Sequence, residues 1–135
     1  MDAMKKFVQQ DHFARYIGVE MLEHGKGTAK ARMEIGNHHR NSAGMVHGGA
    51  IFSLADAVFS IASNSHGTLA VAINVSISFF KAAKGGALFA EAEEVSINPK
   101  LATYLITVTD DAGNRIALFQ GTVYRKKDSI LDIVK

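Results

Sequence analysis

The feature that most constrains this chain is a long apolar segment near its middle. Residues 47–65 fit a helix whose apolar side chains leave little room for a solvated face. These side chains are Ile51, Phe52, Leu54, Val58, Phe59 and Ile61. The longest apolar stretch, 50–62, is shorter than the roughly twenty residues that a membrane span needs, and it contains Asp56. We therefore expect a buried helix and no membrane segment.

Most of the remaining chain alternates apolar and polar side chains with the period of two that is typical of strands. We expect strands over 16–24, 28–35, 69–79, 87–97, 101–109 and 115–126. In the third of these, the apolar residues at the odd positions from Leu69 to Phe79 fall on one face. Before the first strand, residues 2–15 fit a short amphipathic helix with Asp2 as its N-cap.

Together these elements predict one α+β domain over residues 1–135. Strands joined by short turns form an antiparallel sheet, and the single long apolar helix has to bury itself against that sheet. A sheet wrapped around one helix leaves its two edges open. We therefore expect an edge to pair with a second copy of the chain, giving a homodimer.

Composition excludes several classes of function. The chain has no cysteine, which removes disulfides, zinc ribbons and cysteine nucleophiles. Fifteen Lys and Arg against thirteen Asp and Glu give a net charge of +2, and the only dense basic cluster is Arg125–Lys127, so we expect no nucleic-acid partner. The six histidines show no metal-ligand spacing, and we expect no metal. The N-terminus lacks an apolar signal core, which favours a cytoplasmic location.

A polar stripe interrupts the apolar helix. Ser53, Asp56, Ser60 and Ser63 follow spacings of three, four and three, which place them on one side of a helix. A carboxylate among apolar neighbours is costly unless it is paired or faces a wet cleft, and burial raises its pKa toward that of a base or nucleophile active near neutral pH. The alternative is a structural carboxylate hydrogen-bonded at a subunit contact.

The helix begins with two glycines after His47. The first amides of a helix have no intrahelical acceptor, so Gly48 or Gly49 could donate to a ligand oxygen, and the missing side chains allow a close approach. The alternative is a tight turn into the helix. On one straight helix, Gly48 and Asp56 are separated by about 12 Å of rise. If the two residues act on one carbonyl, they have to come from two subunits.

The stretch from Asn41 to Asp56, with Ala62–Gly67, Asn74–Phe80 and Ala117–Arg125, resembles the hotdog-fold acyl-CoA thioesterases of the phenylacetic-acid-degradation (PaaI) type. The resemblance implies a long helix wrapped by an antiparallel sheet, a homodimer and often a homotetramer. It implies hydrolysis of an acyl-CoA thioester without a metal or redox cofactor. Gly48 would polarise the thioester carbonyl, and Asn41 and His47 would hold that loop or the thioester. Asp56 of the neighbouring subunit would activate water or attack the carbonyl directly.

The resemblance leaves the acyl group open among aryl-acetyl, hydroxylated aryl-acetyl, short-chain and medium-chain esters. We expect Gly49, Ser60, Ser63 and Phe52 to line the substrate site, although Phe52 also fits a plain core position. Some relatives carry a water-positioning serine where this chain has Ala72, and Ser60 could take that task. Two other functions remain open: an acyl-CoA hydratase or dehydratase on the same fold, and a non-catalytic acyl-CoA sensor.

Overall fold

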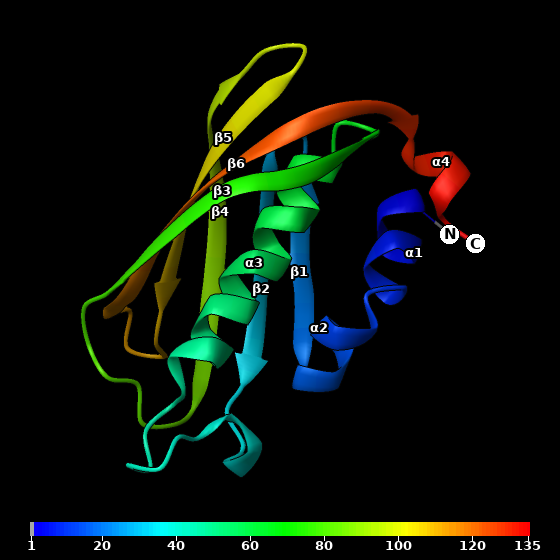
Figure 1. Ribbon diagram of the computed structural model, residues 1–135. Coiled ribbons are helices and arrows are strands. Elements are labelled where there is room, and N and C mark those ends of the chain that lie inside the picture. Colours follow the sequence, from blue (N-terminus) through cyan, green and yellow to red (C-terminus); the bar gives the residue numbers. More distant parts are fainter. Residues whose placement is uncertain (1) are drawn as a thin grey trace.

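The computed structural model describes residues 2–135 and contains one six-stranded antiparallel sheet (Figure 1). The strands are β1 (Val19–Gly25), β2 (Thr28–Glu34), β3 (Thr68–Phe79), β4 (Ala87–Ile97), β5 (Leu101–Thr109) and β6 (Arg115–Ser129). Their order across the sheet is β1-β2-β4-β5-β6-β3, so β1 and β3 are the edges. The predicted α+β architecture is confirmed.

The helix α3 (Gly48–Asn64) lies against the concave side of the sheet, which curves around it (Figure 1). Leu54, Ala55, Val58 and Ala62 on its sheet-facing side have no exposed surface. They pack against apolar residues that project inward from the strands, such as Leu88 on β4, and this layer forms the hydrophobic core. The expected helix over 47–65 is therefore confirmed to within one residue at each end.

Hydrogen bonds fix the C-terminal end of α3 to the sheet. The Asn64 side chain accepts from the backbone N–H of Ala70 at 2.9 Å, and Ser65 Oγ accepts from the N–H of Gly27 at 2.8 Å. His66, just beyond the helix end, lies with its Nε2 2.8 Å from a Glu94 carboxylate oxygen on β4. The end of the helix is thus held by three separate parts of the fold.

The N-terminal segment differs from the single helix expected over 2–15. Asp2 caps α1 (Ala3–Gln9) as expected, but Asp11 accepts from the N–H of Ala14 at 3.0 Å and starts a second helix, α2 (His12–Ile17). Gly18 then ends α2 with a φ of 89°, a left-handed conformation that glycine adopts at low cost. Strand β1 consequently begins at Val19, later than the expected residue 16.

The prediction that the odd-numbered apolar residues of β3 share one face was wrong. The pairing of β3 with β6 shifts between Ala72 and Asn74, so Ile73 is the extra residue of a β-bulge. Val75 lies opposite Gly121 on the inner face, whereas Val71 lies opposite Tyr124 on the outer face. A bulge of one residue reverses the alternation, which is why a strict period of two misplaces half of the strand.

The C-terminal end extends further than the sequence pattern indicated. Strand β6 continues to Ser129, three residues beyond the expected end, and Ser129 caps the short helix α4 (Ile130–Ile133). Ile130 is buried and packs the chain end beside α1, where both termini lie (Figure 1). Among residues 2–135, no helix has the length and apolar character needed to cross a bilayer.

Candidate active site

A cavity of about 310 Å³ opens at the N-terminal end of α3. Asn41 and Gly48 both line it, which brings together two of the residues that the sequence singled out. Its other lining residues come from the start of α3, the loop before it, the end of β3 and the segment after β3; they include Met45, Val46, Ile51, Phe79, Phe80 and Lys81. The cavity thus combines an apolar wall with the polar end of a helix.

Gly48 presents the free amide of this helix end. His47 is the N-cap residue, and its Nδ1 accepts from the N–H of Gly49 at 2.8 Å. Within residues 2–135, the N–H of Gly48 has no hydrogen-bond acceptor. A Cβ at position 48 would lie 3.4 Å from the Phe79 ring, so the absent side chain leaves room beside the amide. Of the two amides considered from sequence, Gly48 offers the free donor and Gly49 does not.

Asn41 holds the loop that leads to this amide. Its side-chain oxygen accepts from the N–H groups of Ala43 at 3.0 Å and Met45 at 3.1 Å, and its own N–H donates to the Met45 carbonyl at 2.7 Å. Asn41 and His47 therefore both bind backbone groups of their own segment. Of the two roles that the resemblance implied for them, this geometry matches holding the loop.

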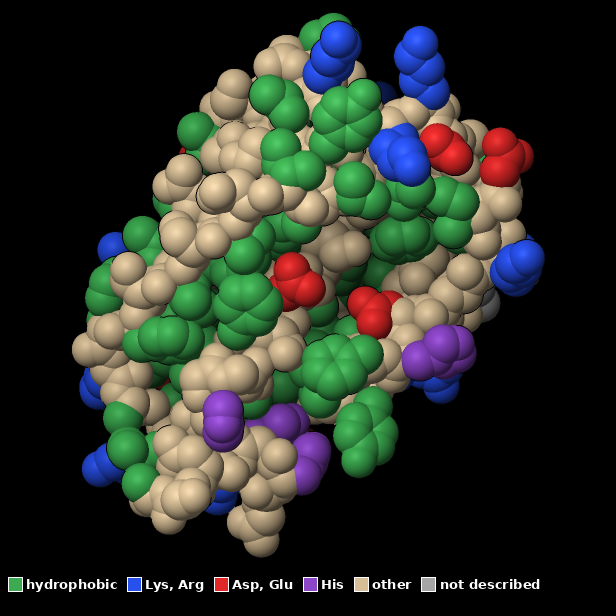
Figure 2. Space-filling model, in the orientation of Figure 1, with side chains coloured by type: hydrophobic (Ala, Val, Ile, Leu, Met, Phe, Trp, Pro, Cys, Tyr) green, Lys and Arg blue, Asp and Glu red, His purple; other side chains and the backbone are tan. Residues whose placement is uncertain are grey.

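Asp56 lies in the middle of α3, on the side turned away from the sheet. Its side chain reaches solvent, yet the protein around it displaces enough water to raise the pKa of the carboxyl, and the negative charge of Asp11 raises it further. Figure 2 shows two acidic side chains among hydrophobic ones at the centre of this face, while Lys and Arg lie at its rim. This environment suits a carboxylate that takes up or releases a proton.

Asp11 is a residue that the sequence analysis missed. It lines a small crevice between the N-terminal helices and α3, together with Ala57 and Ser60, which lie one and four residues after Asp56. Its position as an N-cap could have been predicted, because Asp11 is a polar residue directly before a new apolar turn. Its approach to Asp56 depends on how α2 packs on α3, and nothing in the local sequence signals that packing.

Gly48 and Asp56 do not meet within one chain. Both belong to the continuous helix α3, eight residues apart, which corresponds to about 12 Å along the axis. The carbonyl group of a thioester is far smaller than this separation. One chain alone therefore does not bring the two predicted groups to a single carbonyl.

The other residues of the expected stripe, and Phe52, which we expected to line the substrate site, lie in different surroundings. Ser60 is half-buried and lines the crevice beside Asp11. Ser63 is only 3% exposed, and its hydroxyl donates to the Ser60 carbonyl at 3.3 Å, so it does not face either cavity. Phe52 packs against the core, with its ring centroid 5.4 Å from that of Phe119. Ser53 donates to the Gly49 carbonyl at 2.8 Å and so closes the first turn of the helix.

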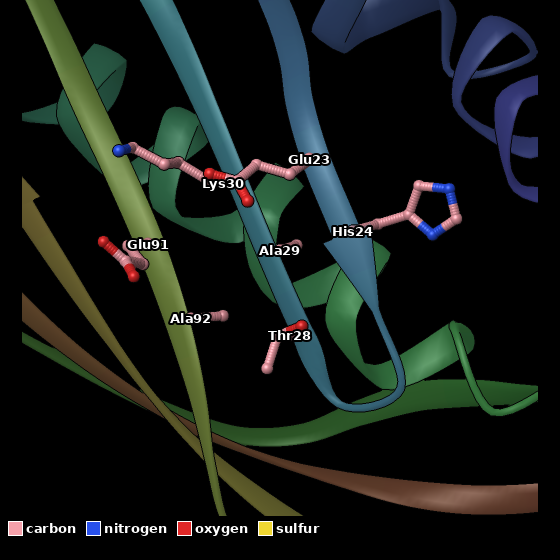
Figure 3. A pocket seen from close by; sticks show the side chains of 7 residues that line it. All are labelled: Glu23, His24, Thr28, Ala29, Lys30, Glu91 and Ala92. Carbon is pink, nitrogen blue, oxygen red and sulfur yellow. The ribbon is translucent and has the colours of Figure 1, made fainter.

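A separate pocket lies on the outer surface of β1, β2 and β4, with α3 behind the strands (Figure 3). Lys30 stands opposite Glu91 in the β2–β4 pairing and opposite Glu23 in the β1–β2 pairing. This row of alternating charges is typical of a solvated sheet face. In the described part of the chain, no group of three His, Asp or Glu side chains is arranged to hold a metal ion.

Comparison with known proteins identifies the family of this chain. The family model of the thioesterase superfamily matches residues 43–128. A protein from Archaeoglobus fulgidus whose name assigns it provisionally to the esterases is 49% identical over 87% of this chain and 77% of its own length. The Escherichia coli protein named acyl-coenzyme A thioesterase PaaI is 30% identical over 87% of this chain and 84% of its own length.

Solved structures extend the comparison. The structure of the Escherichia coli PaaI protein, from the phenylacetic acid degradation operon, matches with a TM-score of 0.90 and 28% identity, covering 94% of this chain and 95% of that one. A Streptococcus mutans protein solved with bound acetyl-CoA matches with a TM-score of 0.79 and 26% identity, covering 83% of this chain and 91% of that one. This chain belongs to the thioesterase superfamily and is a thioester hydrolase of the PaaI type with the hotdog fold.

Proposed function

We propose that this protein hydrolyses acyl-CoA thioesters at a site shared between two copies of the chain. One observation carries the proposal: α3 presents an unpaired amide at Gly48 and a carboxylate of raised pKa at Asp56, about 12 Å apart on one helix. The name of the E. coli relative and the acetyl-CoA bound to the S. mutans structure support coenzyme A as the thiol part of the substrate.

The reaction follows from these two groups. The N–H of Gly48 donates to the thioester carbonyl oxygen and stabilises the negative charge that develops there. Asp56 of the other copy takes a proton from water, whose oxygen attacks the carbonyl carbon; in the alternative route, its carboxylate attacks and the resulting anhydride is hydrolysed. Collapse of the tetrahedral intermediate breaks the C–S bond, and the products are the free acid and the thiol of coenzyme A.

The edge strand β3 supports the part of the proposal that involves a second copy of the chain. It is twelve residues long, it is unpaired on its outer side, and it exposes Val71, Ile73, Val75 and Phe79. Pairing of two such edges would cover this apolar surface and bring a second α3 alongside the first. We extend the proposal to a homodimer of this kind; a homotetramer and a cytoplasmic location remain predictions.

The position of Lys81 favours binding of the coenzyme A phosphates beside this cavity. It is exposed and lines the cavity next to Gly48, whereas Arg125 donates to the Asn98 carbonyl at 2.9 Å on a distant turn. Lys81 is a basic side chain in the lining of this cavity, and we therefore propose it as a contact for the phosphates. For the acyl group we propose aryl-acetyl first, because a structural match at 28% identity comes from a phenylacetic acid degradation operon.

The experiment is a thiol-release assay over a panel of aryl-acetyl, short-chain and medium-chain CoA esters, with the Asp56→Asn protein in parallel. The proposal expects release of coenzyme A by the wild type and almost none by the variant. Binding without thiol release by the wild type would contradict hydrolysis and favour a sensor. Near-normal turnover by Asp56→Asn would remove Asp56 from the mechanism.

A further inference from the structure

His39 is a buried histidine for which the proposed reaction has no use. It is 2% exposed and belongs to the short 3-10 helix Asn37–His39, two residues before Asn41. His38, its neighbour, is exposed and lies against it with a ring-centroid distance of 3.9 Å. A buried polar ring is costly unless its nitrogen atoms are hydrogen-bonded, so the partners of His39 show what the ring does.

Both ring nitrogens of His39 bind backbone groups. Nδ1 accepts from the N–H of Gly36 at 3.0 Å, and Nε2 lies 2.6 Å from the carbonyl oxygen of Ile17. An amide N–H can only donate and a carbonyl oxygen can only accept, so Nδ1 is the acceptor and Nε2 the donor in these two hydrogen bonds. Ile17 is the last residue of α2, and Gly36 follows β2. One side chain therefore joins two segments that are nineteen residues apart in sequence.

The backbone of the same residue reaches the active-site loop. The His39 carbonyl oxygen accepts from the N–H of His47 at 2.7 Å. His47 is the N-cap of α3, and the next amide along the chain is the unpaired N–H of Gly48. The ring that binds α2 is thus one hydrogen bond and one residue away from the proposed oxyanion donor.

We propose that His39 is a positioning residue that orients the Gly48 amide by tying its loop to the C-terminal end of α2. This inference rests on the proposed function, because it concerns the donor used in that reaction. An oxyanion donor acts only if it is held close to its productive geometry, and a displacement of about 1 Å can lower a rate by about a hundredfold. An apolar residue would fill the same space without fixing the position of the loop.

Two substitutions separate the two ring hydrogen bonds. His39→Asn places an amide oxygen near the position of Nδ1 and keeps the bond to Gly36, while His39→Gln places an amide N–H near Nε2 and keeps the bond to Ile17. His39→Leu removes both bonds but keeps an apolar side chain of similar size. His38→Gln, at the exposed neighbour, is the matched control.

The measurement is kcat and KM for the best CoA ester, well below the melting temperature, with amide hydrogen exchange at His47 as a local probe. We expect kcat to fall about tenfold in His39→Asn and His39→Gln, and further in His39→Leu, with KM changed less than about twofold. Amide exchange at His47 should accelerate in all three His39 variants. In His38→Gln, the exchange rate, kcat and KM should all stay unchanged.

Folded His39 variants that melt at lower temperature but keep the wild-type kcat would overturn the inference and reduce His39 to a structural role. That result would leave the proposed function standing, provided that Asp56→Asn is inactive in the same assay. If the wild type releases no thiol from any ester of the panel, the proposed function fails and this inference fails with it.

Discussion

The two edges of the sheet are built in opposite ways. The β1 edge (Val19–Gly25) is seven residues long, carries Glu20 and Glu23, and ends beside the N-terminal helices. The β3 edge (Thr68–Phe79) is twelve residues long, has no charged residue, and exposes several large apolar side chains. Short, charged edges resist pairing with another sheet, and long apolar edges favour it. This difference supports the proposed pairing at β3 and gives no such support for pairing at β1.

The active site follows the same division. The sheet-facing side of α3 is buried within one chain. Gly48 and Asp56 lie on parts of the helix that the same chain does not fully cover. The proposed shared site requires the β3 edge and does not require the β1 edge.

Asp56→Asn should lower kcat by about a thousandfold, because the amide can neither take a proton from water nor attack the carbonyl. The variant should melt at a temperature equal to or above that of the wild type. Burial and the charge of Asp11 raise the pKa of Asp56, so its ionised form is destabilising in the folded state. Thiol release and thermal unfolding at neutral pH measure the two effects, and a large loss of stability would assign Asp56 a structural role.

Gly48→Pro should lower kcat by about a hundredfold to a thousandfold, because proline removes the proposed oxyanion donor. Proline is well tolerated at the first position of a helix, and the extended backbone of His47, with a ψ of 135°, suits a residue that precedes proline. Gly48→Ala is the control, since it keeps the N–H and adds a Cβ at 3.4 Å from Phe79. Equal activity of the two variants would exclude the Gly48 amide as the donor.

Ile73→Lys should split the dimer and reduce activity at least tenfold at low protein concentration, since a charge would have to be buried between the paired edges. Leu22→Lys offers a close control. Ile73 and Leu22 are each the extra residue of a β-bulge in an edge strand, and they are 58% and 43% exposed. The two variants are compared by sedimentation and by activity, both measured across a dilution series. A dimer lost in Leu22→Lys and kept in Ile73→Lys would reverse the assignment of the edges.

Asp11→Asn should move the acidic limb of the kcat profile to lower pH. In the proposed mechanism Asp56 works in its ionised form, so activity should fall as the pH drops through its pKa; removing the like charge of Asp11 lowers that pKa. Asparagine also serves as an N-cap, so α2 should be retained. Asp2→Asn, the same change at the cap of α1, should leave the profile in place, and an unmoved profile in Asp11→Asn would show that Asp11 does not act on Asp56.

Tyr104→Phe should have the smallest effect. Tyr104 is fully buried, and its hydroxyl has no hydrogen-bond partner within residues 2–135. Burial raises its pKa to about 12, so the hydroxyl stays neutral in the working range of pH. Removing an unpaired buried hydroxyl should change the free energy of unfolding by less than about 1 kcal/mol, or stabilise the protein slightly. Denaturant unfolding measures this free energy. A loss of several kcal/mol in Tyr104→Phe would indicate that the hydroxyl has a bound partner such as water.

The sequence was sufficient for features that repeat along the chain. The period of the apolar residues located α3 and most strands, because burial on one side imposes a regular pattern. It was insufficient where one residue changes the geometry: Asp11 starts a new helix, and Ile73 reverses the faces of β3. The bulge depends on the pairing with β6, which leaves no trace in the local pattern.

The candidate site shows the same limit. The two glycines after His47 and the isolated Asp56 were visible as anomalies in an apolar helix, whereas the choice of Gly48 over Gly49 required the cap hydrogen bond from Gly49 to His47. The approach of Asp11 to Asp56 and the contact of His39 with Ile17 join distant segments. Such contacts follow from tertiary packing and cannot be read from spacing.

Mixing two inactive proteins tests the shared site most directly. In a mixed dimer of Gly48→Pro and Asp56→Asn subunits, one of the two sites receives an intact Gly48 from one subunit and an intact Asp56 from the other. If the two proteins are co-refolded in equal amounts, half of the dimers are mixed, so our account predicts recovery of about a quarter of wild-type thiol release. A mixture of folded dimers that stays as inactive as its components would show that both groups act within a single chain, contrary to this account.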